Sequence, residues 1–310
     1  MVASSNHNGQ GRKFSLTPEV SQLGATSWVP LVEDEVTQSF AYYYDYDSSN
    51  DNEGKAPAFA SQADLDRWFR ELHPFNYETN SSDGNAKQHE IAWTGASYKG
   101  EVLLRKTSWC VFDEACKCVY GYSDTWQPIA QSARMKKVIA EITEAINCVI
   151  LGNVNGGHTT SPAFDCCNLN YYPRGGGVGF HADDEFLFDG LRRPVRIVSL
   201  SLTSPPSDKG SARKFQVRRK REDEDGNTAQ KKHNHDVIEV MLKHGDLMTM
   251  EGYFQKHYLH SVWPGDSKEY MDHPHTQGER INLTWRTIVQ HLDGSQECMG
   301  KICPLAAAVK

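Results

Sequence analysis

At 310 residues, of which 38% are hydrophobic and 24% charged, the chain can form one large domain or two small ones around a real core. Its net charge of −7 excludes a protein that coats nucleic acid with its whole surface, although a local basic patch is compatible with it. Because there is no apolar run of 18 residues, no apolar amino-terminal segment and no disulfide-framework spacing among the eight cysteines, we expect a reduced nuclear or cytoplasmic protein that is neither membrane-spanning nor secreted.

The amino-terminal part of the chain is predicted to precede the folded domain. Residues 1–57 are polar, rich in Asn and Ser, and contain an acidic stretch around a cluster of tyrosines, so we expect a flexible tail. The first predicted helix begins near Ser61 and ends before Pro74. Its apolar face consists of Leu65, Trp68, Phe69 and Leu72. A second helix with an apolar stripe follows Pro128.

From residue 164 onward the hydrophobic pattern changes from helical to strand-like. Runs of β-branched and aromatic residues alternate there with Gly, Pro and Asp. The predicted strands cover residues 164–172, 195–203, 237–242, 246–250, 258–263 and 280–290. Helices followed by strands with hairpin-length connections favour an antiparallel α+β fold. We expect one domain over residues 58–292 and a short carboxy-terminal tail over 293–310.

Three residues have the types and spacing of a metal site. His181 and Asp183 are two apart, so on a strand both side chains point to the same side. His260, in a later strand-like run, can supply a third ligand. Two histidines and one carboxylate form the set that suits Fe(II) and leaves coordination positions open. His257 is the main alternative; it lies three residues from His260 and would face the opposite side of a strand, so only one of the two can be the ligand.

A pair of arginines follows this set. Arg280 and Arg286 are six residues apart, so on a strand they share one face with Asn282 and Thr284. The opposite, buried face would consist of Ile281, Leu283 and Trp285. Guanidinium groups bind carboxylates through paired hydrogen bonds. The pattern predicts a site for a dicarboxylate, and exposed arginines on an edge strand are the alternative.

Two other patterns are less specific. Cys116 and Cys118 are close together, but no matching pair of ligands lies nearby in the sequence, so we do not expect zinc. Residues 213–221 are rich in Arg and Lys and predict a contact with a nucleic-acid backbone or a signal for nuclear import. A solvated loop of mixed charge is the alternative for this segment.

Five segments, in order along the chain, resemble the motifs of the AlkB family of Fe(II)- and 2-oxoglutarate-dependent nucleic-acid dioxygenases. They are residues 170–173 (NYYP), 181–185 (HADDE), 245–252 (GDLMTMEG), 257–260 (HYLH) and 280–286 (RINLTWR). The HADDE form and the basic segment are most similar to the eukaryotic repair members, and residues 104–109 and 120–123 resemble the family's nucleotide-recognition lid. The resemblance covers about residues 61–290 and implies a double-stranded β-helix, or jelly roll, supported by amino-terminal helices.

The resemblance implies Fe(II), 2-oxoglutarate as cosubstrate, and O2. Iron would be bound by His181, Asp183 and His260. The far carboxylate of 2-oxoglutarate would be bound by Tyr172, Arg280 and Asn282, and its keto-acid end by Asn170 and Arg286.

The resemblance also implies residues that bind the substrate. Tyr122 and the ring of His181 would enclose a base that is flipped out of its stack, and Trp109 would bind it from the same lid. Asp184 and Glu185 would face the exocyclic amine of the alkylated base and act in catalysis.

The implied function is oxidative demethylation of N-alkylated bases in DNA or RNA, such as 1-methyladenine and 3-methylcytosine, with release of formaldehyde, succinate and CO2. The substrate would be single-stranded or flipped out of a duplex, and a phosphate of it would contact Arg213 and Lys214. We expect a monomer that acts in DNA repair. Two alternatives remain: a dioxygenase of the same fold that hydroxylates a protein side chain or a small molecule, and a catalytically silent nucleic-acid-binding protein.

Overall fold

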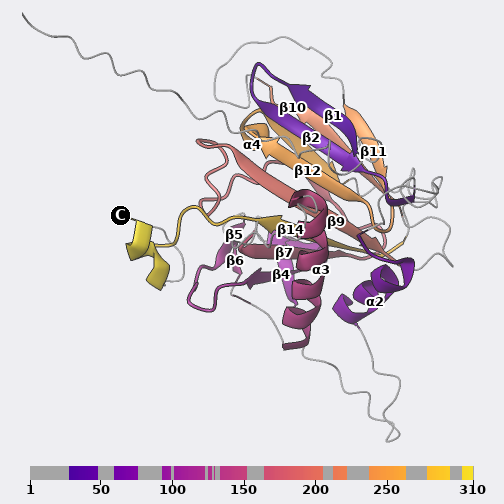
Figure 1. Cartoon of the computed structure of the whole chain (residues 1–310), viewed down its shortest axis with the longest axis horizontal. Coiled ribbons are helices and arrows are strands. Elements are labelled where there is room, and N and C mark those ends of the chain that lie inside the picture. The colour runs from indigo at the N-terminus through magenta and orange to yellow at the C-terminus, as the bar shows by residue number, and fades with distance from the viewer. Residues whose placement is uncertain are drawn as a thin grey trace, which may run out of the picture.

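The computed structural model describes residues 28–47, 59–75, 93–98, 101–122, 125–127, 129, 133–151, 164–204, 212–221, 237–262, 278–293 and 302–309. They form an eight-stranded and a four-stranded sheet that face each other, with two long helices on the outer side of the larger sheet (Figure 1). The predicted α+β fold with a jelly roll, or double-stranded β-helix, is confirmed. No helix among these residues is long and apolar enough to cross a membrane.

Strands that are distant in sequence are neighbours in the sheets. The larger sheet consists, in spatial order, of β1 (Trp28–Asp34), β2 (Ser39–Tyr44), β12 (Leu247–Gly252), β9 (Val195–Thr203), β14 (Arg280–Arg286), β7 (Cys166–Tyr172), β4 (Glu101–Val111) and β3 (Thr94–Tyr98). The smaller sheet consists of β11 (Ile238–Leu242), β10 (Arg213–Arg219), β13 (Tyr258–Val262) and β8 (Val178–His181). A separate hairpin consists of β5 (Tyr120–Tyr122) and β6 (Thr125–Gln127).

Both predicted helices are confirmed. The helical elements are α2 (Gln62–Leu72), α3 (Ala133–Leu151), the short α4 (Phe254–His257) and a 3-10 turn, η3 (Pro304–Val309). Ser61 caps α2, because its hydroxyl accepts a hydrogen bond from the Asp64 N–H at 3.1 Å and the Asp64 carboxylate accepts one from the Ser61 N–H at 3.3 Å. The apolar faces of α2 and α3 pack in one core cluster with the outward face of the larger sheet, including Trp285. Pro128 lies outside the described residues.

All six predicted strands are confirmed, as β7, β9, β11, β12, β13 and β14. Strand β10 was not predicted, because Arg and Lys occupy most of its positions. Its buried face nevertheless alternates correctly, with Phe215 and Val217 in the core cluster between the two sheets.

The predicted flexible tail over residues 1–57 is wrong for residues 28–47. These form β1 and β2, which extend the larger sheet beyond β12. The tyrosine cluster is buried because both faces of β2 are covered: Tyr42 and Tyr44 pack on the side of the helices, and Tyr43 on the side of the smaller sheet. The Tyr43 hydroxyl donates to the buried Asp246 carboxylate at 2.8 Å, and such a partner is what allows a tyrosine to be buried. The rest of the predicted tail lies outside the described residues.

The predicted carboxy-terminal tail over residues 293–310 is also wrong in part. Cys303 is buried, its N–H donates to the carbonyl oxygen of Leu292 at 2.7 Å, and η3 follows it directly. The folded domain therefore includes segments on both sides of the predicted limits, 58 and 292.

Gly252 fits the end of β12 against the turn between β1 and β2. Its φ is +70°, and a Cβ there would lie 2.0 Å from the carbonyl oxygen of Gln38. We expect Gly252→Ala to destabilise the protein by about 2 kcal/mol or more, because a left-handed φ alone costs about 1–2 kcal/mol. Thermal unfolding measures this, with Gly95→Ala as the control, because nothing lies within 4 Å of an added Cβ there. Equal unfolding temperatures for the two variants would contradict the packing of the β1–β2 turn on β12.

Candidate active site

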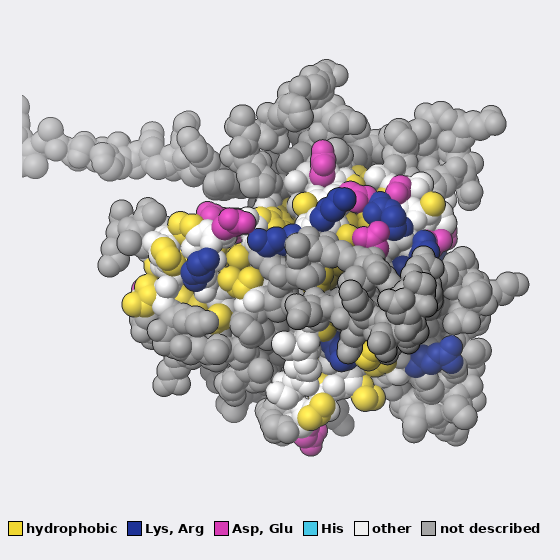
Figure 2. All heavy atoms as spheres, turned by 90° about the horizontal axis from the view of Figure 1, so that it is seen from below, with side chains coloured by type: hydrophobic (Ala, Val, Ile, Leu, Met, Phe, Trp, Pro, Cys, Tyr) yellow, Lys and Arg dark blue, Asp and Glu magenta, His cyan; other side chains and the backbone are white. Residues whose placement is uncertain are grey.

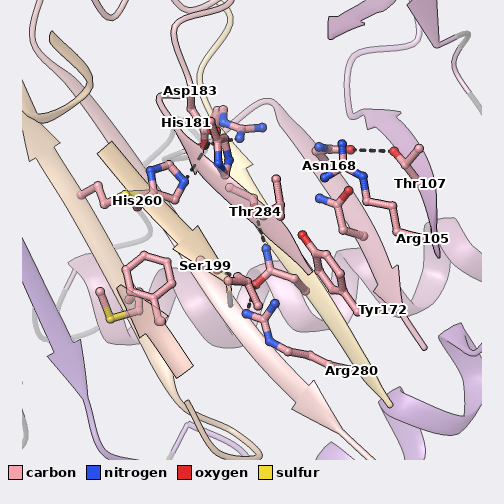
Figure 3. Close-up of a pocket in the computed structure, with 18 of the residues that line it drawn as sticks. Arg105, Thr107, Asn168, Tyr172, His181, Asp183, Ser199, His260, Arg280 and Thr284 are labelled. Carbon is pink, nitrogen blue, oxygen red and sulfur yellow. Dashed lines mark hydrogen bonds and ion pairs between the residues drawn. The ribbon is translucent and has the colours of Figure 1, made fainter. Parts of the chain in front are cut away.

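The residues predicted to bind iron and 2-oxoglutarate meet in a pocket between the two sheets (Figure 3). Strand β14 contributes Arg280, Asn282, Thr284 and Arg286 to its lining. The alternate residues of this strand, Ile281, Leu283 and Trp285, pack on its other side in the core cluster beneath the helices. The predicted division of β14 into a polar and a buried apolar face is therefore confirmed.

His181, Asp183 and His260 converge at one end of the pocket (Figure 3). The pairing of β8 with β13 sets His181 opposite His260, with ring centroids 4.3 Å apart. Asp183 Oδ1 lies 3.6 Å from Nε2 of His181 and 3.8 Å from Nε2 of His260. The three ligand atoms lie within 4.8 Å of one another, whereas His257 ends helix α4 and is outside this group.

Hydrogen bonds fix the orientation of these side chains. His181 donates from Nδ1 to the carbonyl oxygen of Gly179 at 2.8 Å, so its Nε2 carries the lone pair on the side of Asp183. The Asp183 N–H donates to Oε1 of the buried Gln255 at 2.8 Å. Arg286 pairs with Asp183 Oδ2, so the other carboxylate oxygen, Oδ1, faces the two imidazoles.

The electrostatic environment sets the protonation states that a metal requires. Burial, together with the neighbouring His181, lowers the pKa of His260 to about 3 and keeps its imidazole neutral. Burial alone would raise the pKa of Asp183, but Arg286 and the two imidazoles hold it well below its usual range. Neutral imidazoles and an ionised carboxylate are the forms that bind metal ions.

Arg280 lies at the other end of the pocket (Figure 3). It is only 1% exposed; its Nε donates to Ser201 Oγ at 2.9 Å, and one terminal nitrogen donates to Asn282 Oδ1 at 2.6 Å. The guanidinium also lies over the Tyr172 ring, 5.6 Å from its centroid. Its other terminal nitrogen has no hydrogen-bond partner among the described residues. Burial lowers the pKa of Arg280 to about 10, so the group stays cationic at neutral pH and is suited to an anionic ligand.

An open cavity of about 450 Å³ meets this pocket at His181 and Val178. Its size is within the range of small-molecule sites, about 300–1,000 Å³. Other residues of its lining include Leu103, Gly121, Phe180, Asp184 and Glu185. A molecule bound in this cavity would reach the three metal-ligating side chains from the side of His181.

Glu185 connects the open cavity with the hairpin of β5 and β6. Its Oε1 accepts a hydrogen bond from the Tyr120 hydroxyl, whereas its Oε2 is buried and has no hydrogen-bond partner among the described residues. Burial, with the charge of Asp183, raises the pKa of Glu185 to about 7, and Arg286 opposes the shift. The carboxyl group can therefore accept or donate a hydrogen bond near neutral pH.

The sequence profile of the 2OG-Fe(II) oxygenase superfamily matches residues 55–286. The chain belongs to this superfamily. DNA oxidative demethylase ALKBH2 of Arabidopsis thaliana is 28% identical to this oxygenase, over 64% of the chain and 59% of that protein. Alpha-ketoglutarate-dependent dioxygenase alkB homolog 3 of Bos taurus and that of Homo sapiens are each 34% identical, over 43% of the chain and 38% of theirs. The chain thus spans less than two thirds of the length of each of these relatives. The family match and these relatives together confirm the resemblance to the AlkB family.

The superfamily's cofactors, Fe(II), 2-oxoglutarate and O2, fit the pocket of this oxygenase. Two neutral imidazoles and a carboxylate form the donor set that suits Fe(II) and leaves coordination positions open. The buried Arg280, with a terminal nitrogen that has no hydrogen-bond partner among the described residues, suits a carboxylate of 2-oxoglutarate.

Trp109 lines neither cavity, so the predicted contact with substrate is wrong. Its side chain is fully buried, its Nε1 donates to the Cys118 carbonyl oxygen at 2.9 Å, and its ring stacks on Tyr120 with centroids 5.0 Å apart. Arg105 and Thr107 precede it on the same strand face and do line the pocket. Trp109 therefore lies beyond the pocket on this strand, with its ring stacked on Tyr120.

Arg213 is fully buried, so the predicted contact with a phosphate is also wrong. Its guanidinium donates to the carbonyl oxygens of Pro173, at 3.0 Å, and Gly278. Alternation along β10 turns Arg213 inward with Phe215, while the basic composition of the segment suggested an exposed surface.

Lys214 and Arg218 lie on the outer face of β10. Lys214 is within 3.6 Å of the Glu239 carboxylate and remains partly exposed, so its predicted role stays a prediction. Arg218 lies over the ring of Phe180, 4.7 Å from its centroid, beside the open cavity. Tyr122 ends β5, but its side chain lies outside the described part of the chain.

The sequence interpretation missed several pocket residues. Asn168 could have been found from the strand period, because Asn170 and Tyr172 follow it at two-residue spacing on β7. Arg105 and Thr107 come from β4, a strand that was not predicted. Gln255, which accepts a hydrogen bond from the Asp183 N–H, comes from α4 and has no recognisable sequence signal.

Proposed function

We propose that this oxygenase oxidatively removes alkyl groups from N-alkylated bases in DNA or RNA, such as 1-methyladenine and 3-methylcytosine. The observation that carries the proposal is the meeting of two cavities at His181. One contains the clustered ligands and the buried Arg280, and the other is open and lined by carboxylates. Bound iron and 2-oxoglutarate supply the oxidation of the alkyl carbon by O2, and the products are formaldehyde, succinate and CO2. The name of the Arabidopsis thaliana relative, a DNA oxidative demethylase, supports this assignment.

The pocket between the two sheets would hold the cofactors. We assign iron binding to His181, Asp183 and His260. Residues assigned to 2-oxoglutarate are Tyr172, Arg280 and Asn282 at the far carboxylate, and Asn170 and Arg286 at the keto-acid end. Two nitrogens of Arg286 have no hydrogen-bond partner among the described residues, and its third is paired with Asp183, which places the guanidinium at the iron end.

The open cavity would hold the base. A base such as 1-methyladenine is positively charged at neutral pH and carries an exocyclic amine that donates hydrogen bonds. Asp184 is exposed at the cavity, and Glu185 has a carboxylate oxygen that accepts no hydrogen bond from the described residues. These two carboxylates can accept from the amine and offset the charge, while His181 and Tyr122 would enclose the ring.

The nucleic-acid backbone would be held by local contacts. On the face of the molecule that Figure 2 shows, the coloured Lys and Arg side chains lie in separate groups among hydrophobic and acidic ones. This agrees with the net charge of −7, which does not favour a broad basic field. We propose Lys214 and Arg218 for the contacts with phosphates, since Arg218 lies over Phe180 at the open cavity.

We expect Arg218→Gln to weaken binding about equally for every methylated base. A phosphate contact carries no base information, and its loss should lower the slope of log affinity against log salt by about one. Fluorescence anisotropy with methylated adenine and cytosine oligonucleotides measures both quantities. Lys136→Gln, on the outer helix α3, is the control. A changed base preference with an unchanged salt slope would contradict the role of Arg218.

Asp184→Asn should have the opposite effect. It removes one acceptor at the open cavity, so the preference among methylated bases should change while the salt slope stays within error of the parent protein. An altered salt slope with the same base preference would instead place Asp184 near the nucleic-acid backbone.

The decisive experiment is a panel of methylated DNA and RNA oligonucleotides incubated with the full chain, Fe(II) and 2-oxoglutarate. We expect loss of the mass of one methylene group from the target base, with matching amounts of formaldehyde and succinate. Succinate formation stimulated by a peptide or a small molecule, but by no oligonucleotide, would instead support the alternative dioxygenase. Absence of succinate with every substrate would support a silent binding protein.

A further inference from the structure

A second group of metal-ligating side chains lies outside the active-site pocket. Among the described residues, the ligand atoms of Cys116, Cys118, His291 and Cys303 all lie within 4.8 Å of one another. Cys116 and Cys118 precede β5, His291 follows β14, and Cys303 directly precedes η3. The expectation that Cys116 and Cys118 lack a matching pair of ligands is therefore wrong, because the partners lie 175 and 187 residues from Cys116.

The distances between these atoms match a tetrahedron around one ion. His291 Nδ1 lies 3.9, 3.4 and 3.5 Å from the sulfurs of Cys116, Cys118 and Cys303. The sulfurs of Cys303 and Cys116 are 4.0 Å apart. A tetrahedral zinc ion with Zn–S of about 2.3 Å and Zn–N of about 2.0–2.1 Å has ligands separated by about 3.6–3.8 Å.

The surroundings are those of a closed site. All three cysteines are buried in an apolar cluster that includes Trp109, Tyr120 and Leu292. Nε1 of Trp109 donates a hydrogen bond to the carbonyl oxygen of Cys118, and the Lys117 N–H donates to the sulfur of Cys303 at 3.4 Å. Backbone N–H groups directed at thiolates are typical of the outer shell that orients metal ligands.

We propose that Cys116, Cys118, His291 and Cys303 bind one structural zinc ion. Four protein ligands leave no position for a substrate, so the site is structural rather than catalytic. Three thiolates and an imidazole in a tetrahedral arrangement select zinc over the iron of the active site. The ion joins the turn at Cys303 to the segment that leads into β5, whose Tyr120 contacts Glu185.

Metal analysis of the full chain, produced without a histidine tag under reducing conditions, tests the proposal. We expect about one equivalent of zinc by inductively coupled plasma mass spectrometry, both in the parent protein and in Asp183→Ala, in which the iron site is broken. Cys118→Ser should lose this zinc. Cys110→Ser, the matched control at another buried cysteine outside the cluster, should keep it. Zinc that is absent from the parent protein, retained by Cys118→Ser or lost from Asp183→Ala would overturn the assignment.

A spectroscopic measurement keeps the test independent of whether Cys118→Ser folds. Asp183→Ala protein, stripped of zinc and titrated with Co(II), should develop the visible absorption of tetrahedral, thiolate-bound cobalt, and equimolar Zn(II) should remove it. His291→Ala, at the least buried of the four ligands, should weaken or lose this absorption. A chain in which mass spectrometry finds a disulfide between Cys116 and Cys303, or a cobalt spectrum without thiolate bands, would contradict the site.

Discussion

Replacing His260 by alanine should abolish turnover. His260 contributes one of the three clustered ligand atoms, with His181 and Asp183, so under the proposed assignment its loss would remove a direct bond to iron. The effect should exceed the roughly 10–100-fold loss that follows mutation of a residue that only orients a metal ligand. Succinate formation at saturating 2-oxoglutarate measures it. The fold should persist, because His260 Nδ1 makes no hydrogen bond to the described residues and the ring contacts only the rings of His181, at 4.3 Å between centroids, Phe215, at 5.7 Å, and Phe254, at 6.4 Å, among the described aromatic rings.

His257→Ala provides the matched control for this variant. His257 ends helix α4 and does not belong to the ligand cluster, so its replacement should leave turnover within about twofold of the parent enzyme. Full activity in His260→Ala, or loss of activity in His257→Ala alone, would show that the wrong histidine has been assigned.

Arg280→Lys should raise the apparent KM for 2-oxoglutarate by about 10–100-fold, the effect of losing a charged hydrogen bond worth about 1.5–3 kcal/mol. Lysine keeps the positive charge, but it cannot hold Ser201 and Asn282 and also bind a carboxylate with a further nitrogen, as the planar guanidinium can. Initial rates against 2-oxoglutarate concentration, at fixed substrate and iron, measure the change. At saturating 2-oxoglutarate, kcat should fall much less than KM rises.

Ser201→Ala is the accompanying control for Arg280→Lys. It removes only the acceptor that orients Nε of Arg280, so its KM should lie between those of the parent enzyme and Arg280→Lys. An unchanged KM in Arg280→Lys, or a loss of kcat alone, would assign this guanidinium to folding or to another ligand.

The parts of the site that follow a strict strand period were predictable from the sequence. Alternation along β14 correctly separated Arg280, Asn282 and Arg286 from the apolar residues between them. His181 ends β8 and Asp183 lies two residues beyond it, outside the strand, so the expectation that one strand carries both is wrong, although the two side chains do meet the ring of His260 across the pairing of β8 with β13. On β14, the period alone was enough because one face of that strand lines the pocket.

Other features depend on contacts between distant segments, which no local pattern records. The Tyr43 hydroxyl can be buried because Asp246, in a turn about 200 residues away, accepts its hydrogen bond, and the same carboxylate also accepts from the Tyr46 N–H. Composition suggested that Arg213 is exposed, yet backbone carbonyl oxygens from two other segments hold it inside. The ligand cluster around Cys116 is the extreme case, since it draws on three segments that meet only in the folded chain.

Arg286 links the residues proposed to bind the base with those proposed to bind iron. Its guanidinium pairs with Asp183 and also lies over the ring of Tyr120, 5.8 Å from the centroid, while the Tyr120 hydroxyl donates to Glu185. A substitution that reshapes the open cavity through Tyr120 or Glu185 therefore also changes the field at a metal ligand. Under the proposed function, directed evolution of this oxygenase toward new bases would therefore have to screen for metal loading as well as for specificity.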